Sequence, residues 1–392
     1  MFKSVLSLTL AAALGTASFG QTTLTAIPGE AAAAKYASIS QEILRAIEKG
    51  NEYLKSKQNP EGYWAQPSYP ALTALAVTAY MRDPANQGKP VPEYIRKGYD
   101  FILKSQKEDG SIFNRGMSSY NTAVCMMALL AANKEEYAPA ILKGRAYLIK
   151  QQNHFAPDNP YNGGIGYGDK QAPPIADLSN TSLALEAIYY SQKLAKDGKY
   201  GEQPDLDWNA ATEFINRCQQ NPAVNKEPWV SNDKSQLGCF VYRPGVSSAR
   251  DKKSAAFDKA EPPKAYGSMT YAGMQSLIYA NVDKNDPRVK LALKWLENSY
   301  SLDENPGMGV QGLYYYYQAM SKALSAMGID TLTLENGRKV DWRDELANKL
   351  ISIQKSDGSW VNTNNRWWEA DPVLVTSYCV LALEQLYHSI PR

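Results

Sequence analysis

The sequence has little that points to a metal site, a nucleic acid or a membrane-spanning domain. Its 392 residues include only 2 histidines and 4 cysteines, and 42 Lys and Arg nearly balance 40 Asp and Glu. A formal charge of +2 gives neither the basic surface that nucleic acids attract nor a basic patch for an anionic membrane. After the first 20 residues, no segment is apolar enough to cross a bilayer. We therefore expect no nucleic-acid partner, no transmembrane segment and no metal or other cofactor.

Phenylalanine is also scarce, with 8 residues against 26 tyrosines. Tyrosine combines a flat apolar face with a polar tip, so it suits the wall of a half-wet cavity as well as a core. This excess makes a ligand cavity a reasonable expectation.

The N-terminus has the pattern of a secretory signal peptide. Lys3 precedes an apolar run from Val5 to Ala17, and the small residues Ser18 and Gly20 stand at positions −3 and −1 of a cut before Gln21. No cysteine follows the cut, so a lipoprotein anchor is not indicated. We expect export to a periplasm or to the outside.

The rest of the chain reads as a linker and one domain. Residues 21–37 contain Pro28, Gly29 and an alanine run, which indicates a short linker after the signal peptide at 1–20. Residues 38–392 are then a single domain. Nothing in the sequence indicates its oligomeric state.

The four cysteines raise the possibility of a disulfide in an exported chain. Cys218 and Cys239 flank a loop and are the candidate pair. Cys125 and Cys379 lie in apolar helical stretches, where we expect buried free thiols.

A repeated pattern organises the mature chain. It is clearest in KGNEYLKSKQNPEGYW at 49–64, KGYDFILKSQKEDGSI at 97–112 and ELANKLISIQKSDGSW at 345–360, with weaker copies at 143–152, 210–219 and 291–300. Apolar residues recur at helical spacing in each copy, which predicts an amphipathic helix with one face on a core.

A second, more apolar helix is expected after each copy. The candidates are 69–82, 119–132, 177–191, 266–281, 310–327 and 371–388. Helices that are apolar nearly all round belong inside, between other helices. Six such pairs predict an all-α (α/α)6 toroid, a double ring of helices. An open solenoid is the alternative, but neither end shows the polar outer face of a capping repeat.

The motif itself reads as structural. Its first glycine permits close helix approach, and its second glycine ends the outer helix and turns the chain. We expect the glutamine amide to bond orphan backbone groups at the helix ends, with Trp64 or Trp360 stacking across it.

These copies resemble the squalene cyclase-type repeat known as the QW motif (also called the prenyltransferase/squalene oxidase repeat) of the terpenoid cyclase and protein prenyltransferase superfamily. The resemblance covers nearly the whole mature chain. It implies an (α/α)6 barrel whose central cavity, in the enzymes, holds a long isoprenoid. It does not by itself imply activity, because function depends on the site.

The chemistry of squalene-hopene cyclases depends on an Asp-x-Asp-Asp-Thr motif that protonates a double bond. The comparable stretch here runs from Asp177 to Thr181 and has Ser179 and Asn180 at the acid positions. A hydroxyl is far too weak an acid for this step. We therefore expect no alkene-protonating cyclisation, although a cyclase or prenyltransferase-like enzyme with a divergent site stays open.

Two other chemistries of the superfamily lack their residues here. Prenyltransferase β subunits bind zinc through Asp, Cys and His, whereas His154 and His388 have no partner at ligand-like spacing. The Cys-Gly-Glu-Gln segment of thioester domains is absent.

The parallel inner helices of a toroid bring their N-termini to one mouth of the cavity, where partial positive charge converges. We expect the ligand-binding residues there. The candidates are Tyr69, Tyr120, Asn121, Asn180, Tyr266, Tyr271, Tyr314, Tyr315, Trp367 and Trp368, and the catalytic candidates are Asp177, Arg366, Glu369 and Asp371.

Several of these residues also have a purely structural interpretation. Asp371 before Pro372 is typical of an N-cap followed by proline at the first helical position, and Asp177 and Ser179 could cap their helix. Trp367 and Trp368 could be core or lid residues instead of stacking on a ligand.

Two long insertions, 153–176 and 220–265, separate outer from inner helix in the third and fourth pairs. Connections of that length are often functional. We expect them at the same mouth, either as lids or as decoration.

Three functions remain open at this stage. The first is a protein that binds an apolar, isoprenoid-like or aromatic-stacking small molecule without chemistry. The second is an exported polysaccharide lyase or glycoside hydrolase, in which paired carboxylates, or an arginine and a carboxylate, act on a stacked glycan. The third is an interaction scaffold with a filled ring.

Overall fold

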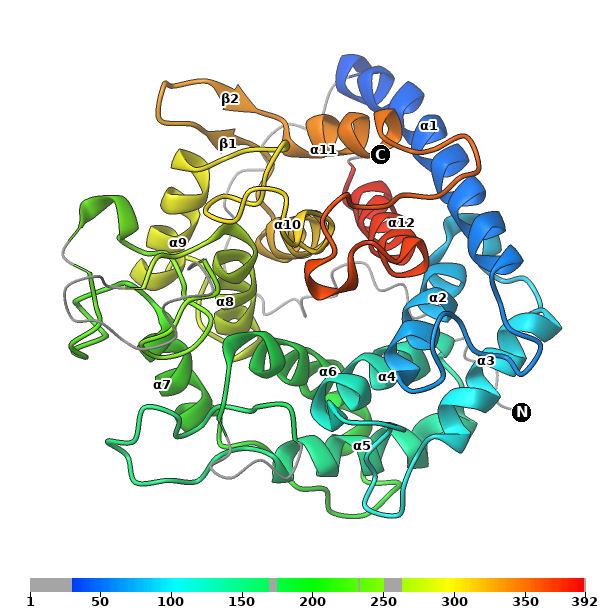
Figure 1. The fold of residues 1–392 in the computed structure, drawn as a ribbon, viewed down its shortest axis with the longest axis horizontal. Coiled ribbons are helices and arrows are strands. Elements are labelled where there is room, and N and C mark those ends of the chain that lie inside the picture. Colours follow the sequence, from blue (N-terminus) through cyan, green and yellow to red (C-terminus); the bar gives the residue numbers. More distant parts are fainter. Residues whose placement is uncertain (1–29, 169–174, 232, 250–262, 391–392) are drawn as a thin grey trace.

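Twelve α-helices alternate between an outer and an inner ring in the part of the chain that the computed structural model describes, residues 30–168, 175–231, 233–249 and 263–390 (Figure 1). The outer helices are α1 (Glu30–Ser56), α3 (Glu93–Lys104), α5 (Ala138–Lys150), α7 (Trp208–Cys218), α9 (Pro287–Asn298) and α11 (Trp342–Ser352). Each includes one copy of the repeated pattern, or its start, and turns an apolar face to the core. All six predicted outer helices are confirmed.

The inner helices are α2 (Pro70–Arg82), α4 (Ser118–Ala132), α6 (Leu178–Lys196), α8 (Gly267–Tyr279), α10 (Leu313–Met327) and α12 (Pro372–Ser389). They begin within three residues of the starts predicted from sequence. Most of their residues are buried on every side, because outer helices cover one face and neighbouring inner helices cover the flanks.

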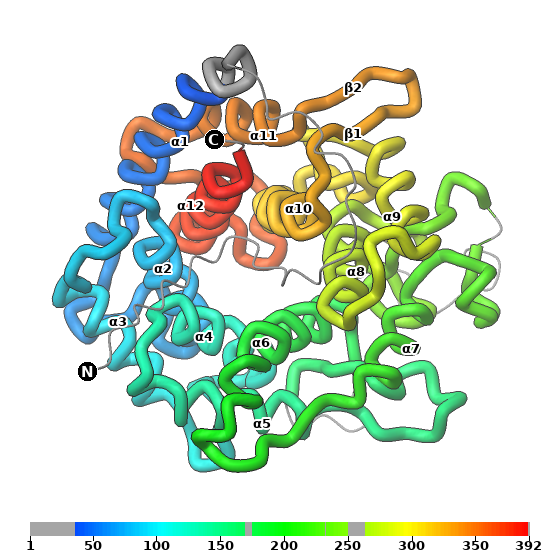
Figure 2. Tube along the Cα trace, turned by 180° about the vertical axis from the view of Figure 1, so that it is seen from behind, coloured from blue at the N-terminus to red at the C-terminus, as the bar shows by residue number. Residues whose placement is uncertain are grey.

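The ring is closed. Helix α12, the last of the chain, packs against both α1 and α2 of the first pair. Figures 1 and 2 show the red α12 beside the blue α1 from opposite sides. The (α/α)6 toroid is therefore confirmed, and the open solenoid is excluded.

The short elements lie outside this double ring. A two-residue pair of antiparallel strands, β1 (Leu332–Thr333) and β2 (Lys339–Val340), forms a small hairpin between α10 and α11. Short 3-10 turns occupy Pro84–Asn86, Glu135–Tyr137, Lys234–Gln236 and Arg366–Trp368.

The structure describes only part of the N-terminal region for which a signal peptide and a linker are predicted. The predicted signal peptide at 1–20 lies outside the described residues. Helix α1 already begins at Glu30, so residues 30–37 of the predicted linker are helical, as an alanine run favours. Among the described helices, none combines the length and apolar character needed to span a membrane.

A circle of glutamines joins neighbouring outer helices. The amide nitrogen at the end of one outer helix donates to a backbone carbonyl at or near the start of the next, or within α1 at the closing step. In chain order the pairs are Gln58 and Tyr94, Gln106 and Ala140, Gln152 and Asp207, Gln219 and Arg288, and Gln354 and Ala46, at 2.7, 2.9, 2.8, 2.8 and 3.0 Å. The last bond closes the circle, since it joins the end of α11 to α1. The glutamines therefore bond backbone groups, as predicted, but the acceptors on the next helix are not orphan groups, since the Asp207 carbonyl also accepts from the Ala211 N–H.

Each of these amides also donates to the carbonyl of a glycine in its own turn. The acceptors are Gly62, Gly110, Gly163, Gly238 and Gly358, at 3.0–3.2 Å. Their φ angles lie between 83° and 96°, where a side chain is strained. A Cβ at Gly358 would stand 2.3 Å from the Lys49 carbonyl oxygen. The glycine therefore serves both the turn and the contact with the next outer helix.

The residue two positions after that glycine ties the turn to the inner helix. The backbone N–H of Trp64 donates to Thr73 at 3.0 Å, and that of Trp360 donates to Thr376 at 3.1 Å. The indole N–H of Trp64 donates to the Leu54 carbonyl at 2.6 Å, so the ring is held by its edge. The Trp64 ring packs against Gly98, the first glycine of the next copy. A Cβ at Gly98 would lie 2.9 Å from a carbon of that ring, so only glycine leaves room for it.

The fifth step of the circle departs from the pattern. No glutamine stands at the end of α9, where Tyr300 donates its hydroxyl to Glu345 of α11 at 3.0 Å. At this step the hydrogen-bond acceptor is a side-chain carboxylate instead of a backbone carbonyl. The β1–β2 hairpin follows at this same step, between α10 and α11.

The predicted disulfide between Cys218 and Cys239 is wrong, because both are free and buried thiols. The segments that carry them do lie side by side, but Gln219 pairs with Phe240, which places Cys239 opposite Gln220 instead of Cys218. The thiol of Cys239 donates to the Gln236 carbonyl. Cys125 and Cys379 are buried free thiols, as expected.

The closing glutamine offers a test of this architecture. Replacing Gln354 with methionine keeps side-chain volume but leaves the carbonyls of Ala46 and Gly358 without their amide donor. We expect the free energy of unfolding to fall by about 1–3 kcal/mol, measured by urea denaturation. Gln41→Met, at an exposed position of α1, is the matched control. An equal loss in the two variants would refute the closing role.

Candidate functional site

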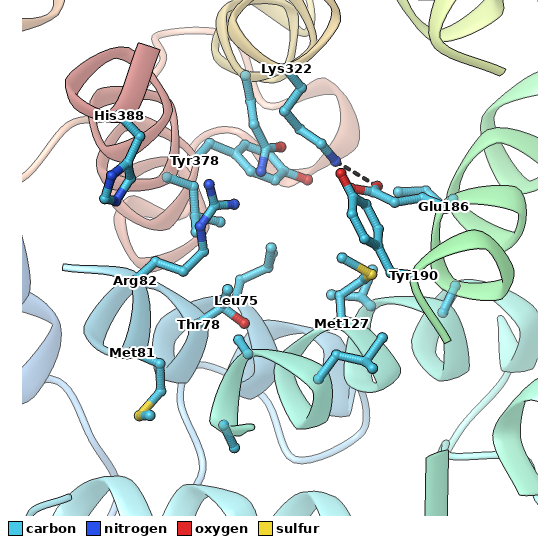
Figure 3. A pocket seen from close by; sticks show the side chains of 18 of the residues that line it. Leu75, Thr78, Met81, Arg82, Met127, Glu186, Tyr190, Lys322, Tyr378 and His388 are labelled. Carbon is cyan, nitrogen blue, oxygen red and sulfur yellow. Dashed lines mark hydrogen bonds and ion pairs between the residues drawn. The ribbon is translucent and has the colours of Figure 1, made fainter. Parts of the chain in front are cut away.

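A cavity of about 1080 Å³ lies inside the inner ring (Figure 3). Its lining includes residues of all six inner helices, so it follows the axis of the toroid. Pockets for small molecules typically measure about 300–1,000 Å³. The ring is therefore hollow, and the space suits one extended organic ligand.

The two sides of the cavity differ in polarity. On the α2 and α4 side the lining is mostly aliphatic and includes Leu75, Met81, Val124, Met127 and Leu130. The α6, α8 and α10 side presents polar groups, which are Ser182, Glu186, Gln275, Gln318 and Lys322. An elongated ligand would thus meet one apolar wall and one wall that can donate and accept hydrogen bonds.

Three tyrosines bound the cavity toward the N-terminal ends of the inner helices. Tyr120 of α4 and Tyr378 of α12 share a hydrogen bond. The ring of Tyr315 lies 6.0 Å from that of Tyr378. Burial raises the pKa of all three hydroxyls, so they stay protonated over the whole physiological range. We call Tyr120, Tyr315 and Tyr378 the tyrosine floor.

The cavity extends from this floor along the inner helices toward their C-terminal ends. Its lining runs from the tyrosine floor to Arg82 and Asn133 at the ends of α2 and α4, and to His388 at the end of α12. Of the residues predicted at the N-terminal mouth, only Tyr120 and Tyr315 line this cavity, and the ligand site at that mouth stays a prediction.

An ion pair crosses the polar wall. The Lys322 ammonium lies 2.5 Å from a Glu186 carboxylate oxygen, and the two side chains are 21% and 7% exposed. Figure 3 shows the pair close to Tyr190, which projects from α6. Burial raises the pKa of Tyr190 to about 12, and the Glu186 charge adds to this while the Arg82 charge opposes it. These four side chains consequently belong to one end of the cavity.

Arg82, the last residue of α2, holds the opposite side of that end. Its Nη2 donates to the Gln385 amide oxygen at 2.8 Å. Its Nε lies 3.9 Å from a carboxylate oxygen of Glu384, which is too long for a hydrogen bond. The guanidinium lines the cavity and remains partly exposed to it.

Glu384 is a fully buried carboxyl behind Arg82. It has no exposed surface, and neither of its oxygens has a hydrogen-bond partner. Burial raises its pKa well above the usual range, and the Arg82 charge offsets this only in part. An ionised carboxylate without hydrogen bonds is very costly in such a place. Burial therefore favours the protonated, neutral form of Glu384.

Asp177, the first catalytic candidate, caps α6. Its carboxylate accepts from the backbone N–H of Asn180 and from the Asn180 side-chain amide, both at 2.8 Å. Burial raises its pKa to about 6, although hydrogen bonds from Asn180 and Tyr242 lower it. Asp177 does not reach the cavity lining.

Glu369 and Asp371 also serve helix starts. The buried Glu369 carboxylate accepts from the backbone N–H of Tyr315 at 2.8 Å and from the Asn362 amide at 2.6 Å, so it stabilises the start of α10. Asp371 caps α12 by accepting from Val373 N–H at 2.8 Å. The structural interpretation of Asp177 and Asp371 as caps is confirmed.

Arg366, Trp367 and Trp368 lie on the surface of the N-terminal end. The Arg366 guanidinium stacks 4.4 Å from the Trp367 ring and donates to Gln311 at 2.6 Å. The Trp368 ring lies 4.7 Å from that of Tyr69. Both tryptophans are more than 40% exposed and have positive φ, which is unusual for bulky residues. None of these four side chains lines the cavity.

The remaining ligand-binding candidates are distributed as follows. Tyr120 and Tyr315 line the cavity, as expected for a ligand site. Asn121 accepts from the Ala71 N–H and donates to the Met117 carbonyl, so it joins the starts of α2 and α4. The other four are buried among neighbours outside the lining: Asn180, Tyr266, Tyr271 and Tyr314.

The described parts of the two insertions do lie at the N-terminal end. The Tyr167 carbonyl accepts from Ser119 N–H at the start of α4, and the Tyr242 carbonyl accepts from Leu178 N–H at the start of α6. None of their described residues lines the cavity. They cover the helix starts and not the space where a ligand fits.

The sequence analysis overlooked Arg82, Glu186, Lys322 and Glu384. A signal was present, because Arg82, Lys322 and Glu384 are the only Asp, Glu, Lys or Arg residues of their helices, and Glu186 interrupts an apolar stretch of α6. Such a residue has to face either a partner or a cavity. Among the described residues, no three His, Cys, Asp or Glu side chains gather closely enough to hold a metal ion.

The state of Glu384 can be tested through stability. Because its folded-state pKa is raised, the free energy of unfolding should fall as pH rises above about 4.5, by up to roughly 1.4 kcal/mol per pH unit. Glu384→Gln should remove this loss and be more stable than wild type at pH 7, with the difference vanishing near pH 4. Urea denaturation across pH 4–8 measures it, with the exposed Glu108→Gln as control. A variant that is less stable at pH 7 than at pH 4, relative to wild type, would instead show an ionised Glu384.

No known family model matches the sequence. Solved structures of the type II terpene cyclase MstE from Scytonema match the fold. The apo form gives a TM-score of 0.52 at 11% identity, covering 89% of this chain and 99% of that chain. A variant in complex with the substrate geranylgeranyl dihydroxybenzoate gives 0.52 at 10% identity, covering 90% and 99%. The likeness extends over nearly the whole of both chains and shows that this protein has the terpenoid cyclase-like toroid fold.

Proposed function

We propose that this protein binds an isoprenoid-type ligand in its central cavity. The observation that carries the proposal is the hollow inner ring, with about 1080 Å³ between an aliphatic wall and a polar one. Burial of apolar ligand surface against Leu75, Val124 and Met127 would supply most of the affinity, at about 25 cal/mol per Å². The tyrosine floor would limit how deep the ligand reaches.

The structural neighbours support this ligand class. Structures of MstE contain geranylgeranyl dihydroxybenzoate as substrate and merosterolic acid A as product. A shared fold at about 10% identity does not transfer the reaction. It does make a ligand of this size and apolar character a sound first choice for binding experiments.

The proposal is binding without alkene protonation. The position of the cyclase acid is occupied by Ser179, whose hydroxyl is too weak an acid for this step. Among the described residues of the lining, Glu186 is the only carboxyl group, and it is paired with Lys322 at 2.5 Å. Protonating an alkene needs a strong acid in its protonated form. The buried carboxyls with a raised pKa, Asp177 and Glu384, do not line the cavity.

The other two functions have less support. A glycan-cleaving enzyme would use Asp177, Arg366, Glu369 and Asp371, but these side chains are bonded at helix starts or on the surface and lie outside the cavity. A scaffold with a filled ring does not account for the cavity. We also propose that the chain is exported, on the basis of the signal-peptide pattern at residues 1–20.

Filling the cavity tests the proposed function. Ala319 lines it on α10, and we expect Ala319→Leu to weaken geranylgeraniol binding and Ala319→Trp to weaken it at least tenfold, because each occupies ligand space. Isothermal titration calorimetry provides the affinities. Ala37→Trp, at an exposed position of α1, is the control and should bind as wild type does. Failure of wild type to bind, or undiminished binding by Ala319→Trp, would refute a ligand in this cavity.

A further inference from the structure

We propose that the ligand is an isoprenoid carboxylic acid, whose carboxylate binds the guanidinium of Arg82 at the C-terminal end of the cavity. This inference rests on the proposed function and specifies the ligand further. It assigns an anchoring role to Arg82, a residue that the sequence analysis did not select.

Arg82 is placed to bind a ligand group. Figure 3 shows it reaching from α2 toward the open centre of the cavity. One side of the guanidinium is fixed, since Nη2 donates to Gln385 at 2.8 Å. Within the described residues, no group accepts a hydrogen bond from its Nη1. A donor edge is therefore available to the cavity, on a side chain that is only 19% exposed.

The charge of Arg82 is only loosely paired among the described residues. Its acidic partner is Glu384, at 3.9 Å, a contact too long for a hydrogen bond, and the buried carboxyl has no other partner. Lys322, by contrast, is paired with Glu186 at 2.5 Å. A half-buried cation with only this distant partner is poorly compensated, and a bound anion at its free edge would improve that balance.

A purely structural explanation of Arg82 is that its positive charge compensates the dipole of α2, because basic residues are favourable at helix C-termini. That role accounts for its position in the sequence. It does not require the guanidinium to turn into the cavity, where solvent is limited. The carbonyl ends of the surrounding inner helices repel an anion, so an acidic ligand can be held there only if a cation such as Arg82 faces it.

The charge balance favours a single carboxylate over a diphosphate. A carboxylate matches the two parallel N–H donors of a guanidinium and carries one negative charge. Among the described lining residues, the other permanent cations are Lys322, which is paired, and Lys89, which is exposed to solvent. Arg82 is thus the one half-buried cation of the described lining without a close carboxylate, which suits a ligand with one negative charge.

Three probes of equal chain length test the inference: geranylgeranoic acid, geranylgeraniol and geranylgeranyl diphosphate. Isothermal titration calorimetry at pH 8 with the wild-type protein should show the acid binding at least tenfold more tightly than the alcohol, and more tightly than the diphosphate. Arg82→Gln should abolish the preference for the acid while changing the affinity for the alcohol by less than twofold. Arg82→Lys, which keeps the charge, should retain part of the preference.

Two further variants define the cause. Arg45→Gln removes an exposed arginine of α1 and should leave the preference unchanged. Glu384→Gln should also leave it unchanged, because glutamine replaces a carboxyl that is already neutral. If Glu384→Gln bound the acid more tightly than the wild type does, Glu384 would be the counterion of Arg82. That result would overturn the inference.

The outcomes separate this inference from the proposed function. Equal binding of acid and alcohol, or an acid preference that survives in Arg82→Gln, overturns the role of Arg82 and leaves isoprenoid binding intact. Tightest binding of the diphosphate overturns the carboxylic acid. Binding of none of the three probes overturns both proposals. Circular dichroism and thermal unfolding show whether each variant is folded.

Discussion

The whole architecture depends on one hydrogen-bonding arrangement, in which a glutamine amide at the end of an outer helix reaches the backbone of the next outer helix and the glycine of its own turn. An amide nitrogen has two N–H donors, and here one bonds a carbonyl of the next outer helix and the other bonds the glycine carbonyl of its own turn. The arrangement recurs at five of the six steps and, through Gln354 and Ala46, joins the last outer helix to the first. It fixes the spacing of the outer ring, and threonines such as Thr73 and Thr376 carry that spacing to the inner ring.

A cavity follows from this geometry because the outer ring sets the diameter and the inner side chains only partly fill it. At the N-terminal end the tyrosine floor and the described parts of the insertions complete the packing. At the C-terminal end the inner helices carry alanine, leucine and methionine on one side and a few charged groups on the other. The buried polar groups differ accordingly. Those at helix starts are satisfied by caps, whereas Arg82 keeps a free donor edge toward the cavity.

Local signals in the sequence predicted local structure well. Asp371 followed by proline was a cap, Asp177 was a cap, and the glycines and glutamines of the repeat took the roles that their chemistry favours. The toroid followed from counting helix pairs. The Cys218–Cys239 disulfide failed because proximity in sequence does not set the register of the two segments. Which part of the ring axis stays hollow depends on the summed side-chain volumes of six helices that are distant in sequence. Local sequence patterns do not contain that sum. They therefore pointed to residues at the helix starts and not to Arg82, Glu186 and Lys322.

The most direct test of the account is a crystal structure of the protein grown with geranylgeranoic acid. The account predicts electron density for the chain along the ring axis, against Leu75, Val124 and Met127, with the carboxylate at Arg82. An empty cavity, or density only beside Trp367 and Trp368 at the opposite end, would contradict it.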